Sequence, residues 1–293
     1  MFSENSLELA KHPLSYSKLK VAKKCPFHFQ KRYNERVKPT NQVEASSAVV
    51  GTTVHAVMEN IIGSLQHESS INMDVVTQHL SGAFVKAAEQ VPKLTSEEAS
   101  RVMDHEDPIR QMALRIAKYG ADNGCSVYIE EALAVDKELN PVPYNSSDAF
   151  FRGKIDLVMV MPSGLAAVID YKTGYRNIKA HEEQMRTYEI LVGYALAPKV
   201  KQNTGVELKA VRTALSFVAD GAIDWFSMST MKDIKTSRTN WFYNFVNGLS
   251  DKVKDGKVNR GSHCNQCRYR SYCGSKVGTR KKKKGPQDAK PKM

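Results

Sequence analysis

Two short apolar segments separated by a tight turn constrain the fold of this chain more than any other feature. Residues 150–160 and 166–173 alternate as β-strands do, and Pro162-Ser163-Gly164 between them is a turn sequence. The two segments therefore predict an antiparallel hairpin. In that hairpin Asp156 and Asp170 lie on neighbouring strands, where one ion can reach both carboxylates.

The second strand of the hairpin runs directly into Asp170-Tyr171-Lys172. Side chains alternate between the two faces of a strand, so Asp170 and Lys172 point the same way and Tyr171 points to the opposite face. A carboxylate can bind a divalent metal ion, and a neighbouring lysine can orient a water molecule or stabilise charge on a phosphate. The pattern suits phosphodiester cleavage, although a solvated ion pair at a strand end is the ordinary alternative.

The first strand of the hairpin also divides into two faces. One face is expected to carry Arg152, Lys154 and Asp156, and the other Gly153, Ile155 and Leu157. Asp156 would then share its face with two basic residues.

Helical spacing of apolar residues predicts a helix over residues 50–65, in which Gly51, His55 and Glu59 form a row beside the buried stripe. A single histidine in such a position is usually structural or solvated. Further helices over about residues 71–121 are predicted to form a helical insertion. The other expected elements are a helix over 15–33 interrupted at Cys25-Pro26, a strand over 126–135, a helix over 180–196, a strand over 206–218, a helix over 231–249 and a flexible segment over 250–259.

The net charge points to a polyanionic partner, nucleic acid first. The formal charge is +12, from 43 Lys and Arg and 31 Asp and Glu. Seven Lys and one Arg against one Asp lie between residues 276 and 292, so this segment carries +7 and the rest of the chain about +5. Residues 276–293 are therefore predicted to be a disordered basic tail that attracts phosphate without sequence preference.

The termini and the cysteines indicate an intracellular protein. The N-terminus lacks the pattern of a secretory signal, and no uninterrupted apolar run approaches the roughly 20 residues of a membrane helix. Five cysteines, three of them in the pattern Cys264-x2-Cys267-x5-Cys273, favour a metal or cluster site over a disulfide framework. A phosphate-binding Gly-x-x-x-x-Gly-Lys-Ser/Thr loop is absent, so no helicase motor is expected in this sequence.

Four short motifs occur in an order typical of one large nuclease family. They are a helix histidine, His55; Gly153-Lys154-Ile155-Asp156; Ile169-Asp170-Tyr171-Lys172-Thr173-Gly174; and Gln184-Met185-Arg186-Thr187-Tyr188. From Leu14 to Cys273 the chain resembles PD-(D/E)XK nucleases of the RecB-like branch, such as AddB-type nuclease domains and CRISPR-associated and phage RecB-like exonucleases.

The resemblance implies an α/β fold. Its restriction-endonuclease-like core would be a central mixed sheet flanked by helices, with the helical insertion and a C-terminal cysteine cluster. Residues 1–275 would form a single nuclease domain, closed by the cysteines at 264–273.

The resemblance also implies a metal centre. Asp156 and Asp170 would supply carboxylate ligands, His55 would complete the coordination, and Tyr171 would contribute its backbone carbonyl. Oxygen ligands with one imidazole suit Mg²⁺ or Mn²⁺. Ile155 stands where the family name has a proline, but the RecB-like branch commonly has the Gly-x-x-Asp form instead.

Further roles follow from the same resemblance. Lys172 would position or activate the attacking water, and Gln184 and Tyr188 would place DNA or brace the site. An additional acidic residue is expected on the preceding strand. Glu130 and Glu131 are both candidates, and Glu131 is preferred.

Some members of this branch hold an iron–sulfur cluster with one cysteine before the nuclease core and three after it. Cys25 with Cys264, Cys267 and Cys273 matches that pattern. Four thiolates suit either a [4Fe–4S] cluster or zinc, and the ligand layout and the resemblance favour the cluster. Cys125 is left over as a small buried side chain.

The resemblance implies a metal-dependent DNA exonuclease in recombination, repair or phage DNA metabolism. Its substrate would be single-stranded DNA or DNA with free ends, and a separate helicase or recombination protein would be its partner. Its location would be the cytoplasm of a bacterium or of a phage host, with no membrane association. Two alternatives remain open: an inactive nucleic-acid-binding module with this fold, and a zinc-stabilised structural protein in which Asp-Tyr-Lys occurs by chance.

Overall fold

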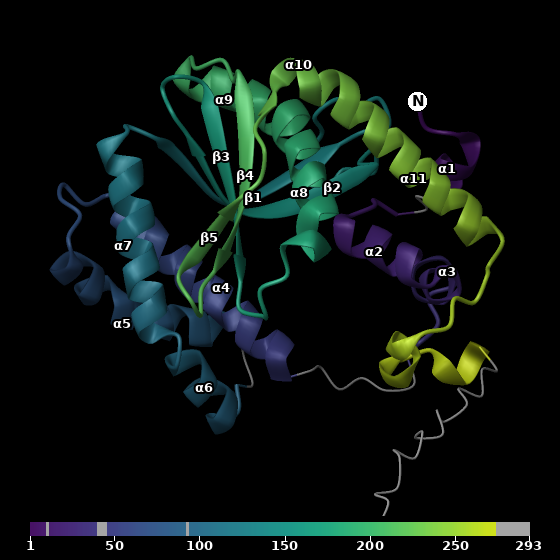
Figure 1. Cartoon of the computed structure of the whole chain (residues 1–293), viewed down its shortest axis with the longest axis horizontal. Coiled ribbons are helices and arrows are strands. Elements are labelled where there is room, and N and C mark those ends of the chain that lie inside the picture. Colours follow the sequence, from purple (N-terminus) through teal and green to yellow (C-terminus); the bar gives the residue numbers. More distant parts are fainter. Residues whose placement is uncertain (10–11, 40–45, 92–93, 274–293) are drawn as a thin grey trace, which may run out of the picture.

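A mixed β-sheet lies between two layers of helices in the computed structural model, which describes residues 1–9, 12–39, 46–91 and 94–273 (Figure 1). Its strands are β1 (Ser126–Val135), β2 (Phe151–Val160), β3 (Leu165–Lys172), β4 (Ala210–Phe217), β5 (Ala222–Trp225) and β6 (Ser229–Thr230). Their order is β1-β2-β3-β4-β5, and β6 pairs with β4. The predicted basic tail at 276–293 lies outside the described residues.

The pairing of the strands confirms the predicted hairpin. Strand β2 pairs antiparallel with both β1 and β3, whereas β3 and β4 run parallel. The ladder between β2 and β3 runs from Val160 opposite Ala166 to Leu157 opposite Ile169. Both faces of this part of the sheet are buried, which is why the two strands are apolar almost throughout.

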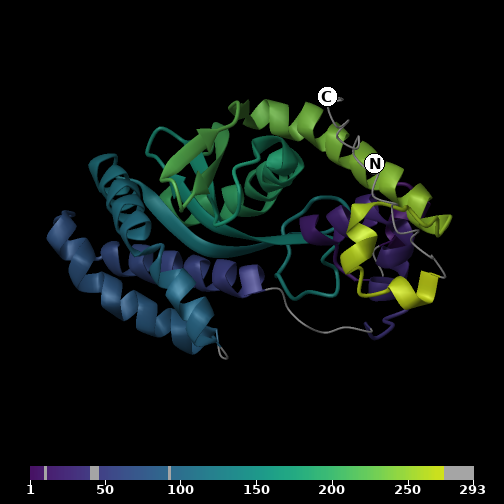
Figure 2. The ribbon, with the colours of Figure 1, turned by 60° about the horizontal axis from the view of Figure 1, so that its bottom comes forward.

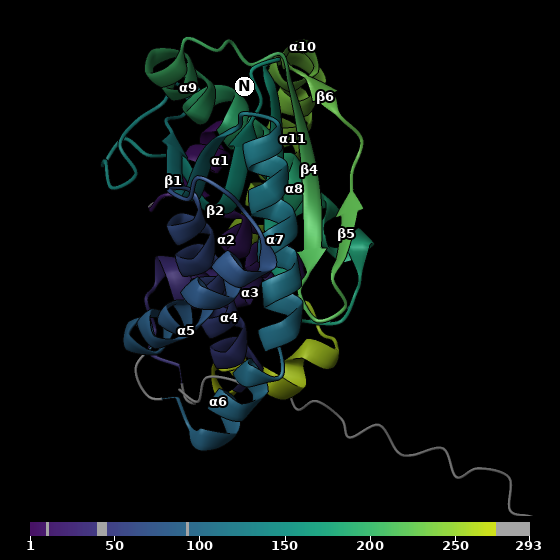
Figure 3. The ribbon, with the colours of Figure 1, turned by 90° about the vertical axis from the view of Figure 1, so that its left-hand side faces the viewer.

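One face of the sheet is covered by four helices, seen from their own side in Figure 3. They are α4 (Ser46–Leu65), α5 (Met73–Gln90), α6 (Ser96–Met103) and α7 (Glu106–Asp122). Helices α5, α6 and α7 occupy the range of about residues 71–121 that was predicted to be helical. Helix α7 packs its buried Ile109, Met112 and Ile116 into the same core as Leu157 and Ile169 of the sheet, so it forms part of the main layer.

Helix α4 is long and apolar enough, by length and composition alone, to cross a membrane. No such segment was predicted, because small and polar residues interrupt the apolar positions of α4. Nine of its residues are buried, among them Val54, Met58 and Ile61, and they pack in the core between α5, α7 and the sheet. The apolar character of α4 is thus used within the fold, as in other core helices.

The other face is covered by α8 (Glu182–Leu191) and α11 (Thr239–Lys254), with shorter helical pieces between and around them. The shorter pieces are α1 (Glu4–Leu9), η2 (Ile178–His181), η3 (Val192–Leu196), α9 (Ala197–Thr204), α10 (Met231–Asp233) and η4 (Ile234–Arg238). Figure 2 shows the two helical layers on opposite sides of the sheet. Helix α1, β5 and β6 were not predicted, and α11 extends to Lys254, where a flexible segment was expected.

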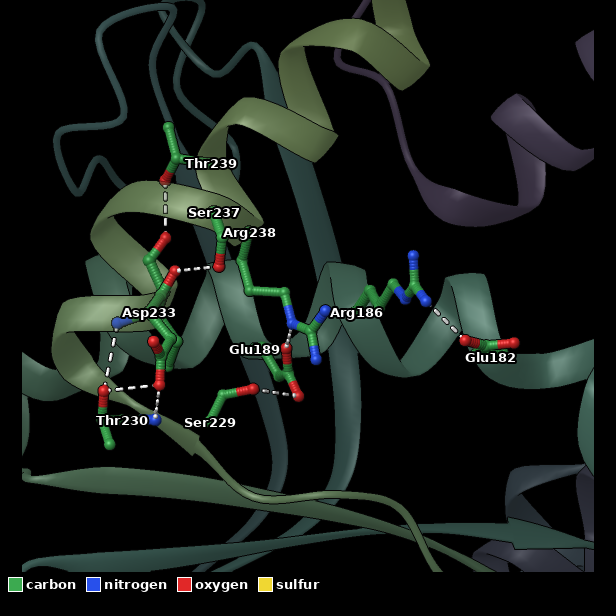
Figure 4. Close-up of polar contacts among 10 residues, drawn as sticks. Glu182, Arg186, Glu189, Ser229, Thr230, Asp233, Ser237, Arg238 and Thr239 are labelled. Atoms are coloured by element: carbon green, nitrogen blue, oxygen red, sulfur yellow. Dashed lines mark hydrogen bonds and ion pairs between the residues drawn. The ribbon is translucent and has the colours of Figure 1, made fainter.

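A buried carboxylate on α8 contacts strand β6 and the helical turn η4. Glu189 on α8 is 2% exposed; its carboxylate accepts hydrogen bonds from Ser229 Oγ at 3.0 Å and from Arg238 Nε at 2.6 Å (Figure 4). Burial raises the pKa of Glu189, and the Arg238 guanidinium opposes that shift. Because a buried charge needs such partners, these contacts fix α8 against the sheet.

The two ends of the described chain meet beside the sheet. Helix α2 (Tyr16–Lys24), helix α3 (Pro26–Phe29) and the π-helical turn η1 (Gln30–Asn34) lie next to the C-terminal turns η5 (Ser262–Gln266) and η6 (Arg270–Cys273) (Figure 2). Asn259 Nδ2 donates to the Lys24 carbonyl at 3.0 Å, and Tyr272 O–H donates to the Lys38 carbonyl at 3.2 Å. This contact brings together cysteines that are far apart in sequence.

Candidate active site

Strands β2 and β3 separate at Asp156 and Asp170, and this point is called the fork. Their ladder ends at Leu157 and Ile169, and in the next position Asp156 Oδ2 accepts a hydrogen bond from the backbone N–H of Tyr171 at 2.8 Å. A carboxylate of β2 therefore satisfies the backbone donor that would otherwise lose its partner at the fork. Asp156 and Asp170 lie on either side of this fork.

The alternation of side chains breaks at the fork. Ile155 and Val158 belong to the core on the α8 side, whereas Leu157 belongs to the core on the α4 side. The prediction that Leu157 shares a face with Ile155 is therefore wrong. Opposite this position on β1, Glu130 has a φ of 49°, a left-handed conformation that departs from the strand. Because of this distortion, two consecutive side chains of β2, Asp156 and Leu157, both face α4.

His55 on α4 lies directly against Asp156. Its Nδ1 is 3.2 Å from Asp156 Oδ2, and its ring meets the Tyr171 ring edge-on, with centroids 5.9 Å apart. Burial lowers the pKa of His55, but the hydrogen bond and charge of Asp156 outweigh it, so the net pKa is raised. One turn earlier, a Cβ at Gly51 would stand 3.1 Å from Thr173 Oγ1, so a glycine lets α4 approach the end of β3.

The row predicted on α4 lines an open cleft of about 520 Å³ together with side chains of the sheet. Gly51, His55 and Glu59 line it from the helix, and Glu130 and Asp156 line it from β1 and β2. Burial, followed by the charges of Asp156 and Glu59, raises the pKa of Glu130. The carboxylates of Glu59, Glu130 and Asp156 therefore line the same cleft as the imidazole of His55.

The preferred additional carboxylate, Glu131, is placed elsewhere. It faces α9, where Lys199 Nζ lies 2.5 Å from its Oε1, on the opposite side of the sheet from His55. The residue that lines the cleft is Glu130. The left-handed turn at Glu130 reverses the alternation of β1, so residues 130 and 131 exchange the faces that a regular strand would give them.

Asp170 points to the α8 side and is 2% exposed. Its Oδ1 accepts hydrogen bonds from Gln184 Nε2 and Tyr188 O–H, each at 3.0 Å, and the Lys172 ammonium lies against its Oδ2. Lys172 Nζ also donates to Gln184 Oε1 at 3.4 Å. Asp170 and Lys172 therefore share a face as predicted, and Gln184 and Tyr188 both reach Asp170.

The electrostatics of Asp170 follow from its burial. Burial and, after it, the charge of Asp156 raise the pKa of Asp170 to about 6, while Lys172 and His55 act in the opposite direction. Nearby, a Cβ at Gly153 would stand 2.9 Å from Leu191 Cδ1 on α8. The glycine of the Gly-x-x-Asp motif thus lets α8, which carries Tyr188, pack against β2.

Four of the five cysteines line one small cavity, between α2, α3 and the C-terminal turns. They are Cys25, Cys264, Cys267 and Cys273. No disulfide joins any two of the five cysteines, all of which lie in the described part of the chain. Burial and the proximity of the other three raise the pKa of the Cys267 thiol. Cys125 stands apart at the start of β1, half-buried, and burial raises the pKa of its thiol.

The comparisons with known proteins decide the family. The model of the PD-(D/E)XK nuclease superfamily matches residues 13–274. The chain belongs to the PD-(D/E)XK nuclease superfamily. A comparison with curated proteins finds no match. Among the solved structures that match, the crystal structure of SSO0001 is 10% identical, with 86% of this chain and 96% of that chain covered. Its TM-score of 0.30 is too low to support any argument.

PD-(D/E)XK proteins are metal-dependent nucleases, so this chain is a nuclease hydrolase for which Mg²⁺ or Mn²⁺ is the expected metal. The described residues contain no group of three His, Cys, Asp or Glu side chains already arranged to hold a metal. The chemistry of the donors nevertheless fits. Asp170 Oδ2 is buried beside the Lys172 ammonium, and Asp156 and His55 add an oxygen and a nitrogen that lie 3.2 Å apart.

Proposed function

We propose that this nuclease is a DNA exonuclease of the RecB-like branch, acting in recombination, repair or phage DNA metabolism. The observation that carries the proposal is the convergence of His55, Asp156, Asp170 and Lys172 at the fork between β2 and β3. The order of the motifs along the chain and the positive charge outside the tail support DNA as the substrate.

In this proposal Asp156, Asp170 and His55 hold the divalent metal ion, with the Tyr171 backbone carbonyl. The bound metal would polarise the scissile phosphate and lower the pKa of a coordinated water. Asp156 also accepts the hydrogen bond from Tyr171 N–H, so the carboxylate that shapes the site is also one that would bind the ion. Glu130 lines the same cleft and replaces Glu131 as the additional acidic residue.

Lys172 would orient the attacking water and stabilise charge on the phosphate. Its ammonium lies against Asp170 Oδ2, so Lys172 is held beside the carboxylate that would bind the metal ion. Gln184 and Tyr188 would brace this arrangement, because both donate to Asp170 Oδ1 and Gln184 Oε1 also accepts from Lys172.

The four cysteines would hold a [4Fe–4S] cluster that joins the N-terminal helices to the C-terminal turns. Their convergence on one cavity supports a four-thiolate centre, and the spacing of one doublet with two separate ligands favours the cluster over zinc. Iron, zinc and acid-labile sulfide analysis of anaerobically purified protein tests this role. Detection of zinc alone, at one ion per chain, would rule out the cluster.

A time course on DNA labelled at either end tests the proposed activity. Single-stranded and double-stranded substrates are incubated with Mg²⁺, with Mn²⁺ and without metal. An exonuclease releases label from one end first and only with metal. Internal fragments appearing first would make the enzyme an endonuclease.

One observation favours an inactive DNA-binding module as the alternative: the described residues hold no preformed group of three metal ligands. In the same assay, binding of DNA without cleavage in either metal would support that module. An absence of both binding and cleavage would leave only a structural role.

A further inference from the structure

A second cleft lies where helix α7 meets the β4–β5 edge of the sheet, and its volume is about 540 Å³. Figure 3 shows α7 beside β4 and β5, and Arg115 Nη1 on α7 donates to the Gly221 carbonyl before β5 at 3.1 Å. Ile169 lines this cleft, while Asp170 faces α8 on the other side of the sheet. The cleft also shares no lining residue with the cleft that contains His55 and Asp156, so it is separate from the proposed metal site.

Two guanidinium groups line this cleft without carboxylate partners among the described residues. Arg115 donates to the Gly221 carbonyl, and Arg212 Nε donates to the Phe226 carbonyl at 3.3 Å. Four other arginines of the chain have a carboxylate instead: Arg110, Arg176, Arg186 and Arg238. Backbone contacts thus orient Arg115 and Arg212 while their charge stays available to an anion.

Two aromatic side chains lie beside these arginines. Trp225 on β5 is 41% exposed and Tyr119 on α7 is 44% exposed, and both line the cleft. The Arg212 guanidinium lies over the Trp225 ring, 5.0 Å from its centroid. Exposed aromatic rings next to arginine form a surface on which a nucleobase stacks.

We propose that this cleft binds a nucleoside phosphate, with the phosphate at Arg115 and Arg212 and the base against Trp225. The volume is within the range of small-ligand sites, roughly 300–1,000 Å³. An acidic peptide would account for the two charges, but it would leave the exposed indole without a function. The proposal goes beyond the nuclease site, because it needs none of the groups at the fork. The nucleoside phosphate comes either from a single strand of DNA or from a free nucleotide.

Intrinsic fluorescence tests the proposal, because the chain has two tryptophans, Trp225 and Trp241. Trp241 stacks on Phe245, with ring centroids 5.1 Å apart, so Trp241→Phe keeps an aromatic ring there and leaves Trp225 as the reporter. This protein is titrated with dAMP, with a single-stranded oligonucleotide of about 12 nucleotides and with an acidic peptide. Divalent metal is withheld, so the strand stays intact whether or not the chain is a nuclease.

We expect saturable quenching of Trp225 by dAMP or by the oligonucleotide, and a dissociation constant about tenfold higher in Arg115→Ala and in Arg212→Ala. Similar affinity for dAMP and the oligonucleotide identifies a free nucleotide, and much tighter oligonucleotide binding identifies a DNA strand. The control, Arg101→Ala, replaces an arginine of α6 that does not line the cleft and should bind like the parent. Quenching by the peptide alone, or by no ligand, or quenching unchanged in both arginine variants would overturn the proposal.

Discussion

The carboxylate of Asp156 accepts a hydrogen bond from the backbone N–H of Tyr171 at 2.8 Å, across the point where β2 and β3 part. A side chain thus replaces the backbone acceptor that a continuous ladder would supply. The same oxygen, Oδ2, lies 3.2 Å from His55 Nδ1. Asp156 therefore links the geometry of the sheet to the proposed metal site.

Replacing Asp156 should reduce stability as well as activity. Asp156→Ala leaves the Tyr171 N–H buried without an acceptor, a loss of about 1–3 kcal/mol in the free energy of unfolding. Urea denaturation with and without the substitution measures this loss. An unchanged free energy of unfolding would show that the hydrogen bond to Tyr171 does not hold the fork.

Glu130 and Glu131 form a matched pair of neighbours on opposite faces of β1. Glu130→Gln should raise the metal concentration for half-maximal DNA cleavage about tenfold, because Glu130 lines the cleft with His55 and Asp156. Glu131→Gln should leave that concentration unchanged, because its partner is Lys199 on α9. A metal titration of both variants decides the assignment, and a larger effect at Glu131 would contradict it.

The buried carboxyl of Asp170 should give the metal-free protein a pH-dependent stability. Burial raises its pKa from 3.8 to about 6, so the folded state binds a proton more tightly than the unfolded state does. This contribution to stability is present below pH 3.8 and is lost as the pH rises through about 6. Between pH 4 and 7 the free energy of unfolding of the wild type should therefore fall relative to that of Asp170→Asn. Parallel curves would contradict the raised pKa.

The proposed cysteine centre predicts which thiols are needed for bound metal. Replacement of Cys25, Cys264, Cys267 or Cys273 by serine should lower the iron content and the melting temperature, because each lines the shared cavity. Cys125→Ser should keep the full metal content, since Cys125 lies at β1. Elemental analysis of the five variants measures this. Equal metal in all five would refute a four-cysteine centre.

Much of the fold could be predicted from local patterns. The alternation of residues 150–160 and 166–173 predicted the β2–β3 hairpin, and it placed Asp170 and Lys172 on one face with Tyr171 buried on the other. The helical spacing over 50–65 predicted α4 and set His55 beside its buried stripe. These predictions hold because each rests on a period that regular backbone geometry enforces.

Other features depend on departures from regular geometry, which a sequence does not display. The positive φ at Glu130 exchanges the faces of residues 130 and 131, so Glu130 lines the cleft and the preferred Glu131 does not. Leu157 likewise lies on the face opposite to the predicted one. Strand β5 is only four residues long, too short for an alternating pattern to stand out. The meeting of Arg115 with β5 depends on tertiary packing between segments about 100 residues apart.

The most direct test of the central claim compares metal-dependent DNA cleavage by the wild type, Asp170→Asn and Lys172→Ala. Lys118→Ala, at an exposed α7 lysine paired with Asp122, is the control. We predict that Asp170→Asn and Lys172→Ala stay folded by circular dichroism and lose cleavage activity by about 10³-fold or more. The control should cleave DNA like the wild type. Undiminished cleavage by both folded variants would contradict a nuclease site at the fork between β2 and β3.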